Sequence, residues 1–390
     1  MFDVDECVRC GTCLESCPVM ELDIVQAQEE IENLIAGSSF VVDECALCGT
    51  CDFHCPNDLT PSELIKGLKH AKIRELEENG KIPRGNKFLF PFNKPNIFIF
   101  YERVMMSPEE LKNLENWKSP SKSEELVILG CSISYLMQHF YKNPTLEGLL
   151  KGKTFAGGID FCCGVVYHRT GMPLPKTDLE DRLYSRFSSL GVKKLIIFCN
   201  ECYEAYKNEY KRISNDFEII SIWEFIGKAI EAGDLKITNK LNLKVAFQDS
   251  CIVKKYPELM EYPRKIVEAT GCEIIELDHN RENALCCGLL LGLVDRKAME
   301  KIRKKRFKEI KKTDTKYIIN TCPGCIYCFS MDLRIQMKKY KVLSVLELLR
   351  MSCGEEIDLF KNVESEVIRV ISKKEKEQPK KDDPKEDFKK

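Results

Sequence analysis

The sequence lacks several features that would assign the chain to common functional classes. It has no run of 18 apolar residues, so we do not expect the chain itself to span a membrane. It has no G-x-G-x-x-G fingerprint, which removes the case for a bound NAD or flavin. A net charge of -1 argues against a nucleic-acid role. The opening residues, Met1 to Cys7, are acidic, so no secretory signal is expected.

Cysteine is the residue present in excess. The 390 residues, enough for two or three cores, include 21 Cys, most of them in C-x2-C spacings. In a small secreted protein such a count would indicate disulfides, but in a large chain this spacing indicates metal in a reducing compartment. We therefore expect a cytoplasmic, metal-binding protein.

The most specific cysteine pattern lies in residues 1–56. Two runs, each C-x2-C-x2-C-x3-C-P, are typical of bacterial ferredoxins with [4Fe-4S] clusters, in which each run lends its fourth cysteine to the other cluster. Zinc is the alternative, but zinc takes four ligands and does not explain two such runs each closed by proline. We expect one cluster on Cys7, Cys10, Cys13 and Cys55, and the other on Cys45, Cys48, Cys51 and Cys17.

A second pattern occurs twice in the remainder of the chain: a lone cysteine, a Cys-Cys-Gly triplet, and a C-x2-C. The gaps are 30 and 35 residues in the first copy and 34 and 34 in the second, which indicates a duplicated domain. The copies comprise Cys131, Cys162, Cys163, Cys199 and Cys202, and Cys251, Cys286, Cys287, Cys322 and Cys325. We call these sets the first and second frames.

Each frame has five thiols, whereas one cubane or one zinc ion takes four ligands. Five thiolates favour something more than a plain cubane cluster. Buried cysteines or a redox disulfide remain the alternative interpretation of either frame. Gly164 and Gly288, which follow the Cys-Cys pairs, would let the main chain lie close to a cluster, as would Gly11 and Gly49 in the ferredoxin runs.

Hydrophobic periodicity places these cysteines in a mixed helical and α/β architecture. Helices are expected over residues 24–35 and after Thr60, with Thr60 and Glu63 as a capping box and Gly80 as the stop. Buried strands are predicted just before four frame cysteines, at 126–129, 195–198, 244–247 and 317–319. Alternating strands and helices predict parallel sheets, with the cysteines at the strands' carboxyl ends. C-x2-C segments at helix N-termini would have free N–H groups nearby.

The resulting fold prediction is α+β and α/β in class. We expect a helical ferredoxin module with two [4Fe-4S] clusters at 1–80, a linker at 81–123, duplicated domains at 124–240 and 241–355, and a disordered charged tail at 372–390. A Ser107 to Glu110 capping box should start a helix within the linker. The Phe-rich stretch 88–100 either packs the module onto the next domain or docks a partner or membrane face.

The two frames resemble the cysteine-rich CCG domains of heterodisulfide reductase. An N-terminal eight-cysteine ferredoxin fused to two such domains is similar to the catalytic iron-sulfur subunit of that enzyme, and the same order occurs in iron-sulfur subunits of glycolate, lactate and glycerol-3-phosphate dehydrogenases. The resemblance covers about residues 1–350. It implies a noncubane [4Fe-4S] cluster on each frame, with Cys162, Cys163, Cys286 and Cys287 as catalytic cluster ligands. The sequence departs from the family at Asn200-Glu201, where Pro-Gly is common, and after Gly288, where Leu289 to Leu291 replace a glycine run.

The resemblance implies an iron-sulfur oxidoreductase that passes electrons from ferredoxin clusters to CCG clusters and reduces a disulfide of the coenzyme M–coenzyme B type. It implies a redox partner, either a flavoprotein, a ferredoxin or a membrane cytochrome, with membrane contact only through that partner. The alternative is an electron-transfer subunit that links a flavin-dependent 2-hydroxy-acid or glycerol-3-phosphate dehydrogenase to a quinone or another acceptor. An interaction protein with vestigial clusters is a third interpretation, which the intact ligand sets oppose.

Several further residues are candidates for supporting roles. His168 and Lys254 lie near ligand cysteines in sequence and could supply protons or hold an anionic substrate; an ordinary surface role is the alternative for both. His279 is a weaker candidate, and His54 is expected to tune a cluster or face solvent. Cys272, Cys328 and Cys353 fall outside both frames and are expected to be buried apolar residues, with Cys328 a substitute ligand as the alternative.

Overall fold

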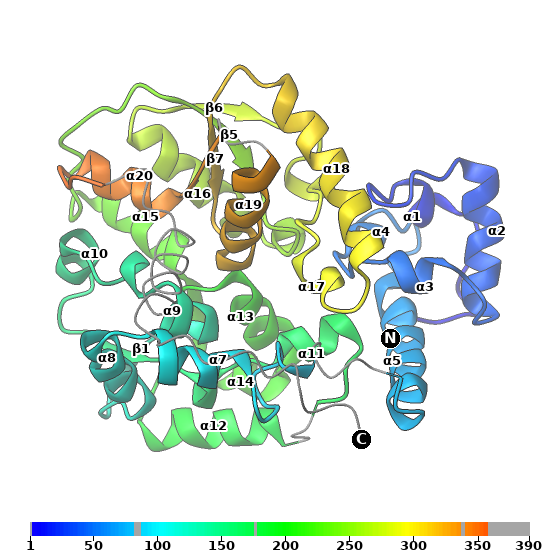
Figure 1. Cartoon of the computed structure of the whole chain (residues 1–390), viewed down its shortest axis with the longest axis horizontal. Coiled ribbons are helices and arrows are strands. Elements are labelled where there is room, and N and C mark those ends of the chain that lie inside the picture. Colours follow the sequence, from blue (N-terminus) through cyan, green and yellow to red (C-terminus); the bar gives the residue numbers. More distant parts are fainter. Residues whose placement is uncertain (1, 82–86, 175–177, 337–339, 358–390) are drawn as a thin grey trace, which may run out of the picture.

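The computed structural model describes residues 2–81, 87–174, 178–336 and 340–357. The predicted charged tail at 372–390 lies outside these residues. Short helices form the N-terminal module, which lies at one edge of the molecule (Figure 1), and two parallel sheets with their helices form the rest. The module's helices are α1 (Thr12–Glu15), α2 (Ile24–Ile35), α3 (Val41–Glu44), α4 (Thr50–Phe53) and α5 (Pro61–Glu78).

Helix α2 confirms the helix expected over residues 24–35. Its apolar residues Ala27, Ile31 and Leu34 are buried against the cysteine-bearing turns, and Asp23 caps it by accepting the N–H of Gln26. Gly11 has φ of +81° at the start of α1, and a Cβ there would lie 2.8 Å from the backbone nitrogen of Gln28. Close packing of α1 against α2 therefore requires glycine at position 11.

The predicted capping box at Thr60 is wrong. The Thr60 side chain forms no cap hydrogen bond, and its buried hydroxyl has no partner among the described residues. Instead, the Asp52 carboxylate accepts the N–H of Ser62 at 2.8 Å and the Ser62 hydroxyl at 2.5 Å. A carboxylate from the preceding turn thus satisfies the helix N-terminus, and Pro61 occupies the first helical position as predicted.

The segment expected to be a linker packs onto the first half of the chain. Ser107 and Glu110 form the predicted capping box, and aromatic residues of the Phe-rich stretch stack on that half, with the rings of Phe92 and Tyr167 5.6 Å apart and those of Phe98 and Tyr135 5.2 Å apart. This geometry supports the packing interpretation of the stretch. The elements are α7 (Ile97–Phe100), the π-helix η1 (Tyr101–Met105) and α8 (Pro108–Lys118).

The first half is a four-stranded parallel sheet in the order β2-β1-β3-β4. Strands β1 and β3 were predicted within one residue, and Leu126 to Ile128 and Leu195 to Ile197 are buried in the core. The strands are β1 (Glu125–Ile128), β2 (Thr154–Ala156), β3 (Lys194–Ile197) and β4 (Glu218–Ser221). The helices are α9 (Gly130–Leu136), η2 (Gln138–Phe140), α10 (Pro144–Leu149), η3 (Ile159–Phe161), α11 (Val165–Thr170), α12 (Leu179–Ser189), α13 (Asn200–Glu204), the π-helix η4 (Ala205–Glu209), α14 (Lys211–Asp216) and α15 (Ile222–Ala232).

The second half repeats this topology, with a parallel sheet in the order β6-β5-β7-β8. The predicted fold class is therefore confirmed, and the expected boundary at residue 240 falls between the sheets; the domain limits themselves remain predictions. The strands are β5 (Lys244–Gln248), β6 (Glu273–Glu276), β7 (Tyr317–Asn320) and β8 (Lys341–Ser344). The helices are η5 (Val253–Lys255), α16 (Pro257–Ala269), η6 (Arg281–Asn283), α17 (Leu289–Gly292), α18 (Arg296–Lys312), α19 (Pro323–Gln336) and α20 (Val345–Ser352).

Candidate iron-sulfur centres

Both frames face a single cavity between the two halves. Its volume is about 110 Å³, and its walls also include Arg169, Glu201 and Leu290. Every frame cysteine lines it: Cys131, Cys162, Cys163, Cys199 and Cys202 from the first half, and Cys251, Cys286, Cys287, Cys322 and Cys325 from the second. The structure thus brings together ten thiols that are far apart in the sequence. We call this space the thiol cavity.

Strand order explains why the thiols converge. Each sheet has two neighbouring central strands, β1 and β3 in the first and β5 and β7 in the second. The connections that leave these two strands run toward opposite edges of the sheet. Loops after such a pair diverge and leave a crevice at the carboxyl edge, where open α/β sheets bind ligands. Cys131 and Cys199 follow the central pair of the first sheet, and Cys251 and Cys322 follow that of the second.

The adjacent cysteines of each pair point to different partners. Cys162 Sγ lies 3.8 Å from Cys131 Sγ, whereas Cys163 is paired with Cys202. Hydrogen bonds from the Cys162 and Cys202 thiols lower the pKa of Cys163 to about 6. In the second half Cys286 pairs with Cys251 and Cys287 with Cys325 in the same way. The two cysteines of a pair therefore need not reach the same corner of one cluster.

A glycine after each pair brings a backbone donor to the thiols. Gly164 and Gly288 have φ of +70° and +78°, a left-handed conformation that favours glycine, and they begin α11 and α17. Their N–H groups donate to Cys162 Sγ at 3.4 Å and Cys286 Sγ at 3.3 Å. These N–H groups would stabilise a thiolate or cluster sulfur, and the close approach of the main chain to a cluster stays a prediction.

The donor sets fit clusters better than single ions. Among the described residues, no three Cys, His, Asp or Glu side chains converge as a single metal ion would require. A tetrahedral zinc site needs four ligand atoms at about 2.3 Å from one centre. A cluster of several irons holds its sulfurs farther apart, and the ten thiols that line the cavity are the donor type that such a cluster takes.

The eight N-terminal cysteines lie in two groups of four, and their crossed ligation of two clusters stays a prediction. Cys55 lies with Cys7, Cys10 and Cys13: burial, followed by these neighbouring thiols, raises the pKa of Cys13 to about 12. Cys17 lies with the other group, since burial and then Cys48 and Cys45 raise its pKa to about 12 as well. We call Cys7, Cys10, Cys13 and Cys55 the outer set, and Cys17, Cys45, Cys48 and Cys51 the inner set.

The inner set adjoins the second frame. Cys51 shares one hydrophobic core with Cys251 and Cys286. The buried ammonium of Lys254 donates to the Thr50 hydroxyl and, at 2.8 Å, to the Ala284 carbonyl, so it joins the module to the second half. The predicted residue Lys254 is thus placed at this contact, outside the walls of the thiol cavity.

Arg169 is a site residue that sequence reasoning missed. Its guanidinium is buried and contacts three parts of the chain: it pairs with Glu201, donates to the Ala46 carbonyl at 2.8 Å, and donates to Cys251 Sγ at 3.3 Å. Burial alone would lower the pKa of Arg169, but Cys251 and Glu201 raise it well above its usual range. Arg169 is therefore a fixed positive charge beside the second frame.

The Asn200-Glu201 dipeptide in the first C-x2-C forms polar contacts near the thiol cavity. Buried Asn200 donates to Thr321 Oγ1 at 3.1 Å and accepts from the Trp223 indole at 3.0 Å, which links the first C-x2-C to the residue before Cys322. The neighbouring Glu201 pairs with Arg169. The sequence shows a departure from Pro-Gly at positions 200 and 201. In the structure Asn200 contacts the second half directly, and Glu201 pairs with Arg169, which contacts Cys251.

The remaining candidates lie elsewhere. His168 lines a second, polar cavity of about 70 Å³ next to the thiol cavity, and burial lowers its pKa. His54 pairs with Asn283 at 3.0 Å and His279 with Glu309 at 2.6 Å. Cys272 is buried as predicted, whereas Cys353 is only half-buried.

Cys328 is buried behind the second frame. Arg303 donates to its sulfur at 2.8 Å, and the Cys328 thiol lies 3.4 Å from the Cys287 carbonyl oxygen. It does not line the thiol cavity, so its place as a substitute ligand stays a prediction.

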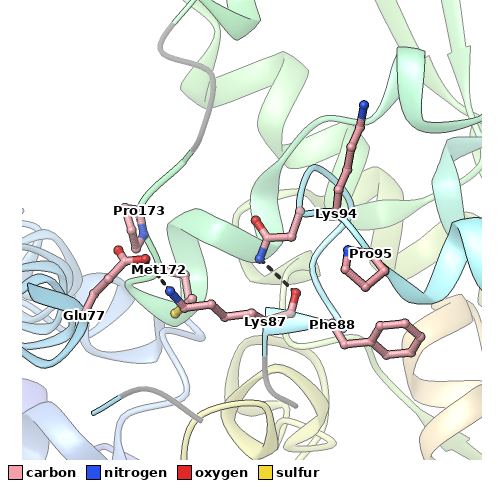
Figure 2. Close-up of a pocket in the computed structure, with 8 residues that line it drawn as sticks. Glu77, Lys87, Phe88, Lys94, Pro95, Met172 and Pro173 are labelled. Carbon is pink, nitrogen blue, oxygen red and sulfur yellow. Dashed lines mark hydrogen bonds and ion pairs between the residues drawn. The ribbon is translucent and has the colours of Figure 1, made fainter. Parts of the chain in front are cut away.

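A larger hollow of about 590 Å³ has no cysteine among its described lining residues (Figure 2). It is lined by residues such as Phe88, Lys94 and Met172, and an ion pair between Lys87 and Glu77 at 2.8 Å crosses its wall. Its described lining contains no thiol and no group that the cluster sites use.

Comparison with known proteins agrees with this geometry. A 4Fe-4S dicluster domain matches residues 3–59, and the cysteine-rich CCG domain matches residues 245–330. The chain is 23% identical to one subunit of the dihydromethanophenazine:CoB–CoM heterodisulfide reductase of Methanosarcina mazei, over 91% of this chain and 95% of that protein. It is 25% identical to one subunit of the CoM/CoB fumarate reductase of Methanothermobacter marburgensis, over 90% and 72% of the two chains.

A third relative is much longer than this chain. The EtfAB:quinone oxidoreductase of Syntrophomonas wolfei is 27% identical over 64% of this chain, and the match spans only 36% of that protein. The relatives differ in the reactions that their names give. The chain is an iron-sulfur oxidoreductase subunit related, at low sequence identity, to the iron-sulfur subunit of heterodisulfide reductase.

Proposed function

We propose that the chain reduces a disulfide of the coenzyme M–coenzyme B type to two thiols, in the manner of heterodisulfide reductase. The observation that carries this proposal is the thiol cavity, in which two complete five-thiol frames face each other. A relay needs only four-ligand clusters in line, whereas opposed five-thiol frames suit a reaction between them. The complete reaction consumes two electrons and two protons, breaks the S–S bond and releases two thiols.

The cofactors we assign follow the donor sets. The outer and inner sets would each hold a cubane [4Fe-4S] cluster, and each frame a noncubane [4Fe-4S] cluster, with Cys162, Cys163, Cys286 and Cys287 as the catalytic ligands. When bound, these clusters supply electrons one at a time. We assign no flavin or NAD to this chain.

The order of the sets supports an electron route from the edge of the molecule inward. The inner set adjoins the second frame, since Arg169 donates both to the Ala46 carbonyl, next to Cys45, and to Cys251 Sγ, and both frames meet at the cavity. Electrons from a partner flavoprotein, ferredoxin or membrane cytochrome would enter at the outer set and reach the second frame before the first. Arg169 would stabilise the added negative charge at the second frame.

Protons can reach the cavity from the neighbouring polar pocket. That pocket is lined by Lys66, Glu209 and His168, and it shares Val165 and Arg169 with the thiol cavity. His168 Nε2 is buried and has no hydrogen-bond partner among the described residues. A neutral histidine with a free ring nitrogen can accept and release a proton, so we assign it proton transfer toward the cavity.

A second candidate function is electron transfer from a flavin-dependent 2-hydroxy-acid or glycerol-3-phosphate dehydrogenase to a quinone or other acceptor. The similarity to the EtfAB:quinone oxidoreductase favours it. The described residues contain no helix long and apolar enough to cross a bilayer. We assign any membrane contact, in either function, to a partner. A cytoplasmic location is part of the proposal.

The test compares the two functions in the purified, iron-loaded protein. Reduced methyl viologen is supplied anaerobically with the coenzyme M–coenzyme B heterodisulfide, and its oxidation is followed by absorbance. We expect turnover with that disulfide in the wild type and at least a roughly hundredfold loss in Cys163→Ser and Cys287→Ser. Reduction of a soluble quinone without any disulfide turnover would favour the electron-transfer function instead.

A further inference from the structure

Charge is distributed unevenly between the N-terminal module and the rest of the chain. Residues 1–60 contain thirteen Asp and Glu residues but only one basic residue other than histidine, Arg9. The whole chain has 60 Lys and Arg against 61 Asp and Glu, so the remainder is correspondingly basic. The module that holds the outer and inner sets is therefore strongly acidic.

On the side that contacts the rest of the chain, acidic residues of the module form ion pairs with lysines. Lys305 pairs with Glu21 at 2.7 Å, Lys301 pairs with Glu44 at 2.7 Å, and both lysines lie on α18, which runs beside the module (Figure 1). Lys255 pairs with Asp52 at 3.0 Å. The chain thus docks its own lysine-rich surface against the module's carboxylates, next to the inner set.

A second group of carboxylates on the module has no ion-pair partner among the residues that the structure describes. We define the outer face as residues 3–9 together with Asn57 and Asp58. Asp3, Asp5, Glu6 and Asp58 are exposed, and none forms an ion pair with any residue that the structure describes. Unpaired carboxylates gathered on one face indicate a site for a basic surface and not for another acidic one.

Apolar side chains are exposed on the same module. Six of the seven large apolar residues that are exposed in the described chain belong to residues 1–60, and Val4 and Val8 of the outer face are 37% and 65% exposed. Two apolar residues amid charges resemble the centre of a small protein interface with a charged rim. Solubility alone would not favour them at this place.

The outer face also covers the outer set. A small crevice is lined by Cys7, Cys10 and Cys55 together with Val8 and Asn57, and Asn57 donates to the Glu6 carbonyl at 2.8 Å. Any protein that binds the outer face therefore comes directly over the cysteines at which the proposed route begins.

We propose that the outer face is the docking site of the redox partner, and that this partner presents a lysine- or arginine-rich surface around its own cofactor. The inference rests on the proposed function in one respect, namely that electrons enter at the outer set. Carboxylates on the outer face steer the partner, and Val4 and Val8 provide the apolar contact. The interaction of α18 with the inner side is the same recognition made within the chain.

The test uses cytochrome c, a basic haem protein, as the probe. The full-length, iron-loaded protein is reduced anaerobically and mixed with oxidised cytochrome c in a stopped-flow instrument, and the second-order rate constant is measured from low to high salt. The variant is D3K/D5K/E6K, and Asp58→Lys reports on the same face from a different segment. The matched control is E124K/D181K/E218K, which makes the same change in net charge at exposed positions of the first half.

We expect the wild-type rate constant to fall steeply as salt rises. The D3K/D5K/E6K variant should react at least roughly tenfold more slowly at low salt, and its rate constant should depend little on salt. The rate constant of the control variant should lie within about twofold of that of the wild type. Iron content checks that each variant is folded, and Asp58→Lys should lose about threefold. Equal rates in the wild type and both outer-face variants would overturn the proposal. An equal loss in the control would also overturn it, because net charge alone would then explain the effect.

Two further measurements separate the alternatives. Sedimentation of the wild type at low salt should show a monomer. A wild-type dimer that dissociates at high salt, and that D3K/D5K/E6K does not form, would assign the outer face to a second copy of the chain and overturn the redox-partner proposal. Disulfide reduction driven by methyl viologen should be unchanged in the outer-face variants. If it is absent even in the wild type, the proposed function fails while the docking result still stands.

Discussion

Arg169 gives the sharpest test of how the protein tunes the second frame. The guanidinium donates to Cys251 Sγ at 3.3 Å and is buried, so its charge is poorly screened by water. In the proposed function, one-electron reduction of a cluster on the second frame would add negative charge there, which Arg169 would stabilise. Arg169→Gln removes that charge while keeping a polar side chain of moderate length, and should therefore lower the reduction potential.

The size of the shift follows from the geometry. Two unit charges about 4 Å apart in surroundings of effective dielectric constant about 20 interact with roughly 4 kcal/mol. Since 100 mV corresponds to about 2.3 kcal/mol per electron, the upper limit is about 170 mV. The added electron is shared among several atoms, so we expect a decrease on the order of 50 to 150 mV.

The assay is an anaerobic redox titration monitored by EPR on wild type, Arg169→Gln, Arg169→Lys and Arg350→Gln. Arg169→Lys retains the charge and should lie between wild type and Arg169→Gln. Arg350→Gln breaks a comparably buried ion pair, with Glu355 at 2.9 Å, whose residues do not line the thiol cavity, and should leave every potential unchanged. Potentials in Arg169→Gln that match the wild type within about 20 mV would refute the assignment.

Three further predictions concern ligation, docking and pH. Cys286→Ser should lose about four irons per chain, whereas Cys272→Ala, outside both frames, should lose none. Chemical analysis measures the iron content, and equal iron in the two variants would contradict the ligand assignment. Lys254→Met leaves the Thr50 hydroxyl and the Ala284 carbonyl without their buried donor and should lower the free energy of unfolding by about 2 to 4 kcal/mol; an unchanged urea midpoint would argue against its bridging role. Burial raises the pKa of Glu347 to about 7, so the folded state holds its proton longer than the unfolded state, and stability should fall by up to about 3 kcal/mol as pH rises from about 4.5 to 7. Glu347→Gln can still accept the Ser344 N–H and should remove this loss of stability. If urea titrations show the same pH dependence of the unfolding free energy in Glu347→Gln and in the wild type, the Glu347 carboxyl is not responsible for it.

Much of the architecture follows from sequence because short-range patterns determine it. Thiol spacing indicated both kinds of site, and the buried runs before Cys131 and Cys251 predicted strands that the structure contains. The outer strands of the two sheets, β2, β4, β6 and β8, were not identified, since each has only two apolar residues where the central strands have three, which gives little signal. The Thr60 cap failed because the competing acceptor, Asp52, lies ten residues from Ser62 in sequence.

The candidate site was less predictable because it forms between halves that are distant in sequence. Nothing local distinguishes Arg169 from a surface arginine near the end of a short helix, yet it contacts Ala46, Glu201 and Cys251, up to 123 positions away. The facing of the two frames across one cavity is likewise a tertiary fact that spacing cannot supply. Asn200 and Glu201 were the one local sign, and they were visible as a departure from the family pattern.

The central claim is that both frames hold clusters that act on a disulfide in the thiol cavity. Anaerobic iron and sulfide analysis combined with EPR, before and after adding the coenzyme M–coenzyme B heterodisulfide to half-oxidised protein, tests it most directly. The account predicts about sixteen irons per chain and a new paramagnetic signal that requires the disulfide. About eight irons, or about sixteen irons without a disulfide-dependent signal, would contradict it.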